Sequence, residues 1–437
     1  MKIKLLSHSS VTIKTSKVNI LCDPWYIETA FNDGWALLPK PNFDYNELRK
    51  IDYLWISHEH PDHFHIPTLK AIKPYLREDV VIVYQELFGD KVPKFLKKFG
   101  FNNIILLKHG KTKLIEKANV RLTIFQIGTM DSALLVQDEK NNVLINNDCE
   151  LSDKDSQFIS SYYTNLDLLM SQFSIAGFDG ILNQKKLKEK SSEKLNSLLL
   201  YSKMLKSKNL IPFASFVYFC SEDNKFLNDY SNDIEDVHNI FIDNKTKCTL
   251  LLPGESFDLN DSSPHNNIKR IQDFQEIRKQ HSDFLLEAKR IEINEIISAF
   301  NSFVVDLKSK YPKFILNYLL KPFSVKILDL DKTYLFNFKE NCAYESPKNH
   351  ADMSMNSQPL FYCFNFAWGI QTLGVSARYK IFDRSFIDNV WKYYRIITSL
   401  NNAEISSKNI PRALKLLFKR RKIIFKQIFH RLKIRFN

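Results

Sequence analysis

Glycine is scarce in this chain. Only ten of the 437 residues are glycine, and they do not form the closely spaced pattern of a phosphate-binding loop. The sequence therefore predicts no glycine-rich cofactor site. No segment reaches the roughly 18 consecutive apolar residues that a membrane-spanning helix needs. The first residues, "MKIKLLSHSSVTIKTSK", have too short an apolar region for a secretory signal and are typical of a first β-strand. We therefore expect a cytoplasmic protein.

Cysteines are few and widely separated. Their spacing fits neither a disulfide framework nor a zinc or iron–sulfur centre held by cysteines. Reduced thiols are expected at all six positions, Cys22, Cys149, Cys220, Cys248, Cys342 and Cys363. The rest of the composition is that of a globular protein, with 44% hydrophobic and 13% aromatic residues. The length fits two domains, or one large domain with appendages.

Acidic residues are absent from the last 33 positions, Ile405 to Asn437, which hold eleven Lys or Arg. Subtracting these eleven from the net charge of +13 leaves only +2 for the other 404 residues. Apolar residues recur at helical spacing between residues 408 and 437, which predicts a basic amphipathic helix on an anionic membrane surface. Docking on the chain's own acidic surface is the alternative. No nucleic-acid partner is expected, because no base-reading motif accompanies the charge.

Short β-rich runs such as "VTIKT", "VNILCD", "VVIVY" and "NVLINND" fill the first 150 residues, with helical stretches at "IPTLKAIKPYL" and "DKVPKFLKKFG". A basic amphipathic helix from about 183 to 209 precedes two predicted strands, "LIPFASFVYF" and "CTLLLPGESFDL". The polar stretch "DLNDSSPHNN" then indicates a boundary. We expect an α/β domain over residues 1–258, an accessory α+β region over 259–400 and the basic tail over 401–437.

Four histidines crowd into "WISHEHPDHFH", Trp55 to His65, although the chain has only 11. His58, His60, Asp62 and His63 form the pattern H-x-H-x-D-H directly after an apolar strand. A strand end and turn can aim such side chains into one small volume, and imidazole with carboxylate suits zinc, iron or manganese. The alternative is a polar loop whose histidines only cap the following helix. His65 lies outside the pattern and is expected to be a bystander.

This pattern resembles that of the metallo-β-lactamase superfamily, whose fold is an αββα sandwich with metals at its rim. The upstream "NILCDPW" and the downstream "VLINNDCE" fit the same family. More narrowly, several segments are similar in order to the metallo-β-lactamase-like part of the CMP-N-acetylneuraminate hydroxylases. These segments include "CDPWYIETAFNDGWALLPKP", "INNDCELSD", "LIPFASFVYFCSEDNKFLNDY" and "ADMSMNSQPLFYCFNFAWGIQTLGVSARYKIFD".

The resemblance implies a set of site residues. His58 and His60 would hold one divalent metal ion, and Asp62 and His63 would hold a second or orient a bound water. Asp148 matches the superfamily's bridging carboxylate. Asp23 matches a buried aspartate that braces the histidine loop, a role outside the ligand set that fixes ligand orientation. Its purely structural role is an equal alternative.

Two features depart from the family. The superfamily usually supplies another metal-binding histidine just before the strand "SALLVQ", yet "RLTIFQIGTMDSALLVQ" contains none. His8 and His109 could substitute, although each is better explained as structural. The hydroxylases also carry a Rieske iron–sulfur domain before this part, whereas this sequence starts directly with a strand. We therefore expect any electrons to come from an external donor.

Three functional hypotheses follow. The first, on resemblance, is an iron-dependent oxygenase that hydroxylates an amino sugar or sugar nucleotide. The second is a hydrolase of an ester or phosphodiester, often zinc-dependent, in which Asp62 acts in catalysis by orienting a metal-bound water. The third is a metal-poor binding protein, which the missing histidine keeps open.

Overall fold

The β-rich runs of the first half form strands in two seven-stranded sheets. The structure is a computed structural model that describes residues 1–87, 90–128, 130–261, 265–281, 285–346, 350–402 and 405–406. Contacts divide the chain into two units, one of residues 1–177 with 183–287 and one of residues 178–182 with 288–437. The first unit therefore extends beyond residue 258. We describe each unit by itself.

The first sheet combines antiparallel and parallel strands. In spatial order its members are β16 (Ser256–Asp258), β1 (Lys2–Leu5), β2 (Val11–Lys14), β3 (Asn19–Cys22), β5 (Tyr53–Trp55), β6 (Val81–Gln85) and β7 (Asn103–Leu107). The pairs β3–β5, β5–β6 and β6–β7 are parallel, so their carboxyl ends lie along the same edge.

The second sheet is antiparallel over one half and parallel over the other. Its strands are β15 (Lys247–Cys248), β13 (Ser207–Pro212), β12 (Leu166–Ser171), β11 (Asn142–Asn147), β10 (Asp131–Gln137), β9 (Val120–Ile127) and β8 (Lys111–Ile115). The parallel pairing of β11 with β12 shifts register between Ile145 and Asn147. This irregularity ends β11 directly before Asp148.

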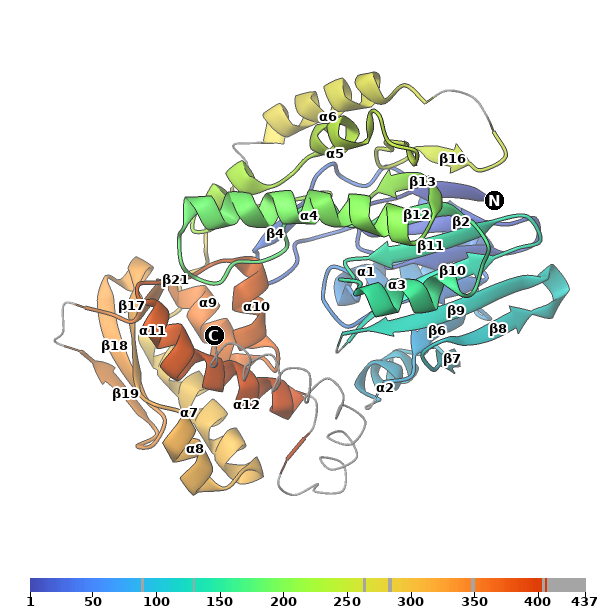
Figure 1. Cartoon of the computed structure of the whole chain (residues 1–437). Helices are drawn as coiled ribbons and strands as arrows, with labels where there is room; N and C mark the ends of the chain where they lie inside the picture. The colour runs from blue at the N-terminus through green and yellow to red at the C-terminus, as the bar shows by residue number, and fades with distance from the viewer. Residues whose placement is uncertain are drawn as a thin grey trace. The chain divides into compact units, whose positions relative to one another are not determined.

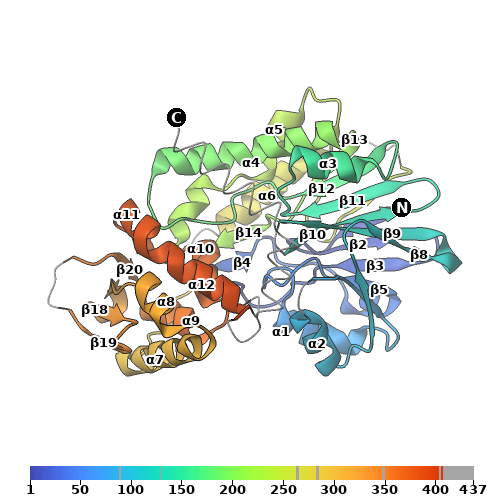
Figure 2. The same ribbon diagram turned by 60° about the horizontal axis from the view of Figure 1, so that its bottom comes forward.

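The two sheets face each other across an apolar core to which both contribute fully buried residues such as Ile13, Ile20, Leu134 and Leu144. Helices cover the outer faces (Figure 1, Figure 2). On the first sheet these are α1 (Ile66–Ile72) and α2 (Lys91–Lys98). On the second they are α3 (Asp153–Ser160), α4 (Gln184–Met204), α5 (Ile234–Phe241) and α6 (Asn267–His281). The αββα sandwich implied by the resemblance is thereby confirmed.

Two runs that the sequence predicts as single strands are each divided. "LIPFASFVYF" forms the end of β13 and the separate strand β14 (Val217–Phe219), because Ala214 takes a left-handed conformation with φ of 53°. β14 pairs with β4 (Trp35–Leu37) in a small antiparallel sheet. "CTLLLPGESFDL" contributes β15 to one sheet and β16 to the other, with Gly254 at φ of 99° between them.

The second unit is an α+β structure. Its sheet has the order β19 (Cys342–Glu345), β18 (Lys332–Asn337), β17 (Phe323–Ile327), β20 (Met353–Met355) and β21 (Lys380–Ile381). Its helices are α7 (Ile293–Lys310), α8 (Lys313–Leu319), α9 (Ser357–Asn365), α10 (Gly369–Ser376), α11 (Arg384–Phe386) and α12 (Lys392–Asn402). The predicted tail helix over residues 408–437 lies outside the described residues. Within the described ranges, no helix has the length and apolarity to cross a membrane.

Candidate metal centre

The candidate ligands stand where strands of the two sheets begin or end. The H-x-H-x-D-H residues lie between β5 and α1, and Asp23 directly follows β3, the parallel neighbour of β5. Asp131 begins β10 and Asp148 follows β11. His8 lies in the turn between β1 and β2. The fold therefore gathers residues from five separate chain segments at one rim of the sandwich.

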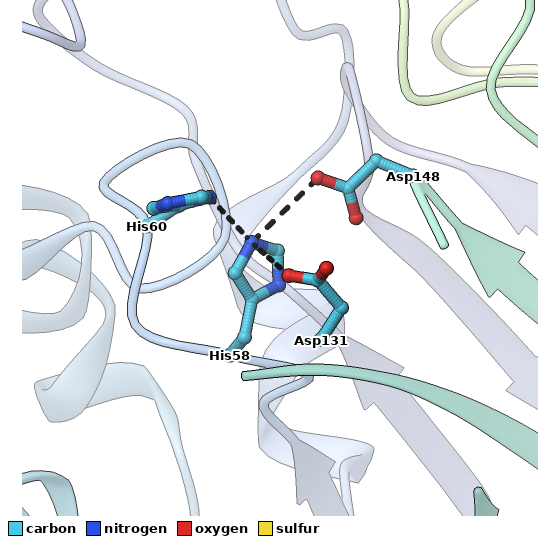
Figure 3. Close-up of side chains that lie close together, drawn as sticks. All are labelled: His58, His60, Asp131 and Asp148. Atoms are coloured by element: carbon cyan, nitrogen blue, oxygen red, sulfur yellow. Dashed lines mark hydrogen bonds and ion pairs between the residues drawn. The ribbon is translucent and has the colours of Figure 1, made fainter. Parts of the chain in front are cut away.

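A first group consists of His58, His60, Asp131 and Asp148 (Figure 3). His58 Nε2 lies 2.8 Å from His60 Nδ1, 3.7 Å from Asp131 Oδ1 and 3.6 Å from Asp148 Oδ2. The four side chains thus point their donor atoms toward one small volume. Three of them belong to the site that the sequence predicts, and Asp131 is new.

A second group consists of His8, Asp62 and His63. Asp62 Oδ2 lies 3.3 Å from His8 Nε2 and 3.2 Å from His63 Nε2. Asp148 connects the groups, because its Oδ2 is also 3.7 Å from His63 Nε2. Residues separated by 85 positions therefore meet, as the family resemblance implies. Their roles as ligands stay predictions.

Asp23 fixes the histidine loop, residues 57–65, through hydrogen bonds to Ser57 and His63. Its buried carboxylate accepts hydrogen bonds from Ser57 N at 2.8 Å, Ser57 Oγ at 2.6 Å and Asn147 Nδ2 at 2.8 Å. His63 Nδ1 is 2.8 Å from Asp23 Oδ2. With Nδ1 directed at Asp23, Nε2 faces the candidate ligands, and its lone pair would be available to a metal once the Nε2 proton is lost.

Asp131 is held close to His58 through the carbonyl of Ser57. That oxygen accepts hydrogen bonds from Gln85 Nε2 and from Ser132 Oγ, each at 2.7 Å. Gln85 Nε2 also donates to the carbonyl of Met130. The residues on both sides of Asp131 are therefore tied to the start of the histidine loop.

An aromatic loop covers the centre. Trp25, Phe31 and Trp35 are at most 4% exposed. The Phe31 ring lies 6.0 Å from His60, and the rings of Trp25 and Trp35 lie 5.6 and 6.1 Å from His8. Phe31 has a φ of 56°, an unusual conformation for a bulky residue that is found mainly where surrounding structure enforces it.

His65 has a structural role at the base of this loop. It is the N-cap of α1 and accepts a hydrogen bond from Thr68 N. Its Nε2 lies 3.2 Å from the carbonyl of Thr29 in the aromatic loop. Neither candidate metal-binding group among the described residues includes His65. His109 also lies elsewhere, stacked on Phe158 with ring centroids 4.9 Å apart.

Burial and mutual charge control protonation of the metal-free centre. Burial opposes the charged form of His63, but Asp62, Asp148 and Asp23 outweigh burial and raise its pKa well above its usual value. Burial and the charge of Asp148 raise the pKa of Asp131 to about 7. Burial, with nearby Asp131 and Asp148, also raises the pKa of Cys149 well above its usual value. Both causes favour the neutral thiol of Cys149 in the metal-free centre.

The donor atoms fit divalent metal ions. Four ligands placed about 2.1 Å from a tetrahedral ion lie about 3.4 Å from one another. The separations around His58 Nε2, from 2.8 to 3.7 Å, bracket that value. Among the described residues, Asp62 Oδ1 and Asp148 Oδ1 are buried oxygen atoms without a hydrogen-bond partner. Buried polar atoms normally have a partner, so these two free carboxylate oxygens favour a bound ion.

Sequence reasoning missed one member of this centre and undervalued another. Asp131 directly precedes the strand "SALLVQ", where the family pattern calls for a histidine. The family pattern predicts a histidine here, so it gives no signal for a carboxylate in its place. His8 is a possible substitute ligand in the sequence but is better explained there as structural, since a turn between two strands carries no pattern that marks a ligand.

Comparisons with known proteins agree with this fold. Residues 2–133 match the family model described as a beta-lactamase superfamily domain. The cytidine monophosphate-N-acetylneuraminic acid hydroxylase of Cricetulus griseus is 28% identical over 280 residues, which cover 59% of this chain and 48% of that protein. The Xenopus laevis hydroxylase is 31% identical over 180 residues, 40% of this chain and 29% of that protein. The chain thus spans about half the length of the Cricetulus relative. The recognition of this superfamily and of the hydroxylases as relatives is confirmed.

Solved structures with similarity include a diiron beta-hydroxylase, CmlA, from Streptomyces venezuelae and a metallo hydrolase from the archaeon Ignicoccus hospitalis. The first has 12% identity and a TM-score of 0.42, covering 59% of this chain and 53% of that chain. The second has 17% identity and a TM-score of 0.40, covering 59% of this chain and 98% of that chain.

Proposed function

We propose that this metallo-β-lactamase-fold protein is a metal-dependent oxygenase that hydroxylates an amino sugar or sugar nucleotide. The observation that carries the proposal is the pair of adjoining histidine and carboxylate groups, in a chain similar over 280 residues to a sugar-nucleotide hydroxylase. His58, His60, Asp131 and Asp148 would hold one ion. His8, Asp62 and His63 would hold the other, with Asp148 between them.

The ligand types favour iron over zinc. With Asp131 in place of the expected histidine, the first group offers two imidazoles and two carboxylates and no thiolate. Oxygen-rich donor sets of this kind suit iron and manganese, whereas zinc accepts them with less selectivity. Bound ions would supply redox or Lewis-acid chemistry that side chains lack.

The chain's own residues position and protect the reacting region. Asp23 holds the orientation of His63. The hydrogen bonds of Gln85 and Ser132 to the carbonyl of Ser57 hold Asp131 in place. Phe31, Trp25 and Trp35 exclude water from one side of the centre. The cavity beside His8 has a volume of only about 10 Å³. It has room for about one water molecule and not for a sugar, so we assign no substrate pocket to it.

Metal analysis and a product assay test this function together. Protein purified without added metal should contain iron. With oxygen, an external electron donor and cytidine monophosphate-N-acetylneuraminic acid, it should form a product heavier by one oxygen atom. Two electrons and two protons from the donor account for the water formed from the second oxygen atom. The His60→Ala variant is the control and should form none.

A hydrolase is the second candidate. Asp62 Oδ2 is occupied by His8 and His63, while Asp62 Oδ1 has no hydrogen-bond partner among the described residues. This free oxygen could orient a water molecule for attack on an ester or phosphodiester. Zinc in the purified protein, with ester cleavage that needs no reductant, would favour this candidate. Protein without bound metal would instead favour a binding function.

We further propose that the basic tail, residues 408–437, holds the protein at an anionic membrane surface from the cytoplasmic side. Eleven Lys and Arg without an acidic residue support this proposal, at about 1 kcal/mol each before screening. Removal of the tail after Glu404 should abolish co-sedimentation with anionic vesicles at low salt. Equal sedimentation of the truncated protein would contradict the proposal.

A further inference from the structure

Helix α8 in the second unit has one face in the core and one in solvent. Leu316 and Leu320 are at most 1% exposed. On the other face, Phe314 is 75% exposed, Tyr318 is 74% exposed and Ile315 is 39% exposed. Phe314 and Tyr318 stand four positions apart, so their side chains lie on the same face of the helix. An outward face of two aromatic residues and an isoleucine is unusual for a helix of a soluble domain.

Two lysines flank this face. Residues 307–328 contain five lysines and no acidic residue, but Lys310 pairs with Asp306 and Lys326 with Asp331. Lys313 begins α8, and Lys321 follows it with its Nζ 5.2 Å from the centre of the Tyr318 ring. Aromatic rings flanked by lysines are typical of segments that lie at the boundary between lipid head groups and acyl chains.

The last described residues of the chain lie beside the start of the same helix. Tyr311 Oη donates a hydrogen bond to the carbonyl of Ile405 at 2.5 Å, and Asn401 Nδ2 donates to Asp306 Oδ2 at 3.3 Å. Tyr311 is the C-cap of α7 and directly precedes Pro312, the N-cap of α8. Ile405, three positions before the basic tail starts in the sequence, is therefore held at the junction of α7 and α8.

We propose that the outward face of α8, formed by Phe314, Ile315 and Tyr318 with the flanking lysines, docks on an anionic bilayer together with the tail. The aromatic rings would enter the head-group region while Lys313 and Lys321 contact lipid phosphates. Two attachment points on one chain bind as a linked pair, which strengthens each. This inference is independent of the proposed metal chemistry.

Matched serine variants test the face. The double variant Phe314→Ser/Tyr318→Ser should lower partitioning into phosphatidylcholine vesicles that contain phosphatidylserine by about tenfold or more, because two apolar rings no longer leave water. Tyr344→Ser is the control, since Tyr344 is 47% exposed in the same unit but neighbours Glu345. It should bind like the unaltered protein. Melting temperature and metal content should show that all variants are folded.

A second measurement does not depend on loss of binding. In Tyr318→Trp, the emission of the new tryptophan should shift to shorter wavelength when anionic vesicles are added, and lipids brominated in their acyl chains should quench it. Unshifted emission, or vesicle binding by the double serine variant equal to that of the unaltered protein, would overturn the docking face while leaving the tail proposal intact. Conversion of a dimer to a monomer by the double variant, with unchanged vesicle binding, would identify the face as a contact between copies and would also overturn it.

Discussion

Replacement of Asp131 by asparagine should change the stability of the metal-free protein and its metal affinity in opposite directions. In the metal-free state, burial and Asp148 raise the pKa of Asp131 to about 7, whereas an unfolded aspartate titrates near 4. The folded protein therefore binds this proton more tightly than the unfolded chain does. Stability that the protonated carboxyl provides at low pH is lost as pH rises from about 4 to about 7.

The size of that loss follows from the shift. About three pKa units correspond to roughly 4 kcal/mol of unfolding free energy above pH 7. Asp131→Asn keeps the shape of the side chain and removes the charge. The metal-free variant should therefore be more stable than the unaltered protein above pH 7, by at most that amount, and equal to it at low pH. Metal affinity should fall at least 100-fold, about 2.7 kcal/mol, because even partners outside the ligand set cost up to that factor.

Urea unfolding of chelator-treated protein on both sides of pH 7 measures the first effect, and metal titration against a competing chelator measures the second. Asp243→Asn, at an exposed aspartate of the first unit, is the matched control and should change neither quantity. If Asp131→Asn binds metal normally, Asp131 is not a ligand. If it also fails to stabilise the metal-free protein above pH 7, the interaction between Asp131 and Asp148 is misjudged.

Three further predictions concern the same rim. His60→Ala should remove bound metal, whereas His65→Ala should keep it and lose about 1 kcal/mol of unfolding free energy with the cap of α1; equal metal loss in both, measured by elemental analysis, would contradict this assignment. Asp23→Asn should weaken metal binding by about 10- to 100-fold and cost about 3 kcal/mol or more, because it breaks a buried pair with His63. Calorimetry and metal titration would show whether only one of these effects occurs. Chelation should lower the melting temperature of the unaltered protein but not that of His60→Ala, since an ion at 100 times its Kd adds about 2.7 kcal/mol to the free energy of unfolding. An equal decrease in both proteins would show that an ion held by His60 does not stabilise the fold.

Much of the sandwich could be predicted from local pattern. Strands such as β11 alternate with turn signals, and the long helix α4 lies within the range that its amphipathic pattern gives. The errors fall where one apolar run serves two elements. β13 and β14, and likewise β15 and β16, belong to different sheets. Residue type alone does not reveal such divisions, because each half is as apolar as a single buried strand.

The candidate site was predictable to the extent that its residues share one short segment. Four of them, His58, His60, Asp62 and His63, lie within six positions, so their spacing alone predicts a metal site. Asp148 and Asp23 became visible only through the family resemblance, since each is a single aspartate after a β-strand. Asp131 and His8 depend on strand pairing across the rim, which one sequence read alone does not define.

The arrangement of charges explains why this rim should need an ion for both structure and function. Three carboxylates and four imidazoles converge in the two groups, and most of these side chains are buried. The ion pairs of His63 offset part of the desolvation cost, but Asp131 and Asp148 repel each other when both are ionised, which together with burial raises the pKa of Asp131 to about 7. Buried like charges are retained in proteins mainly where a cation joins them. The hydrogen bonds of Gln85 and Ser132 to the carbonyl of Ser57 hold Asp131 near Asp148. This placement would lower the stability of the metal-free protein and favour binding of the ion.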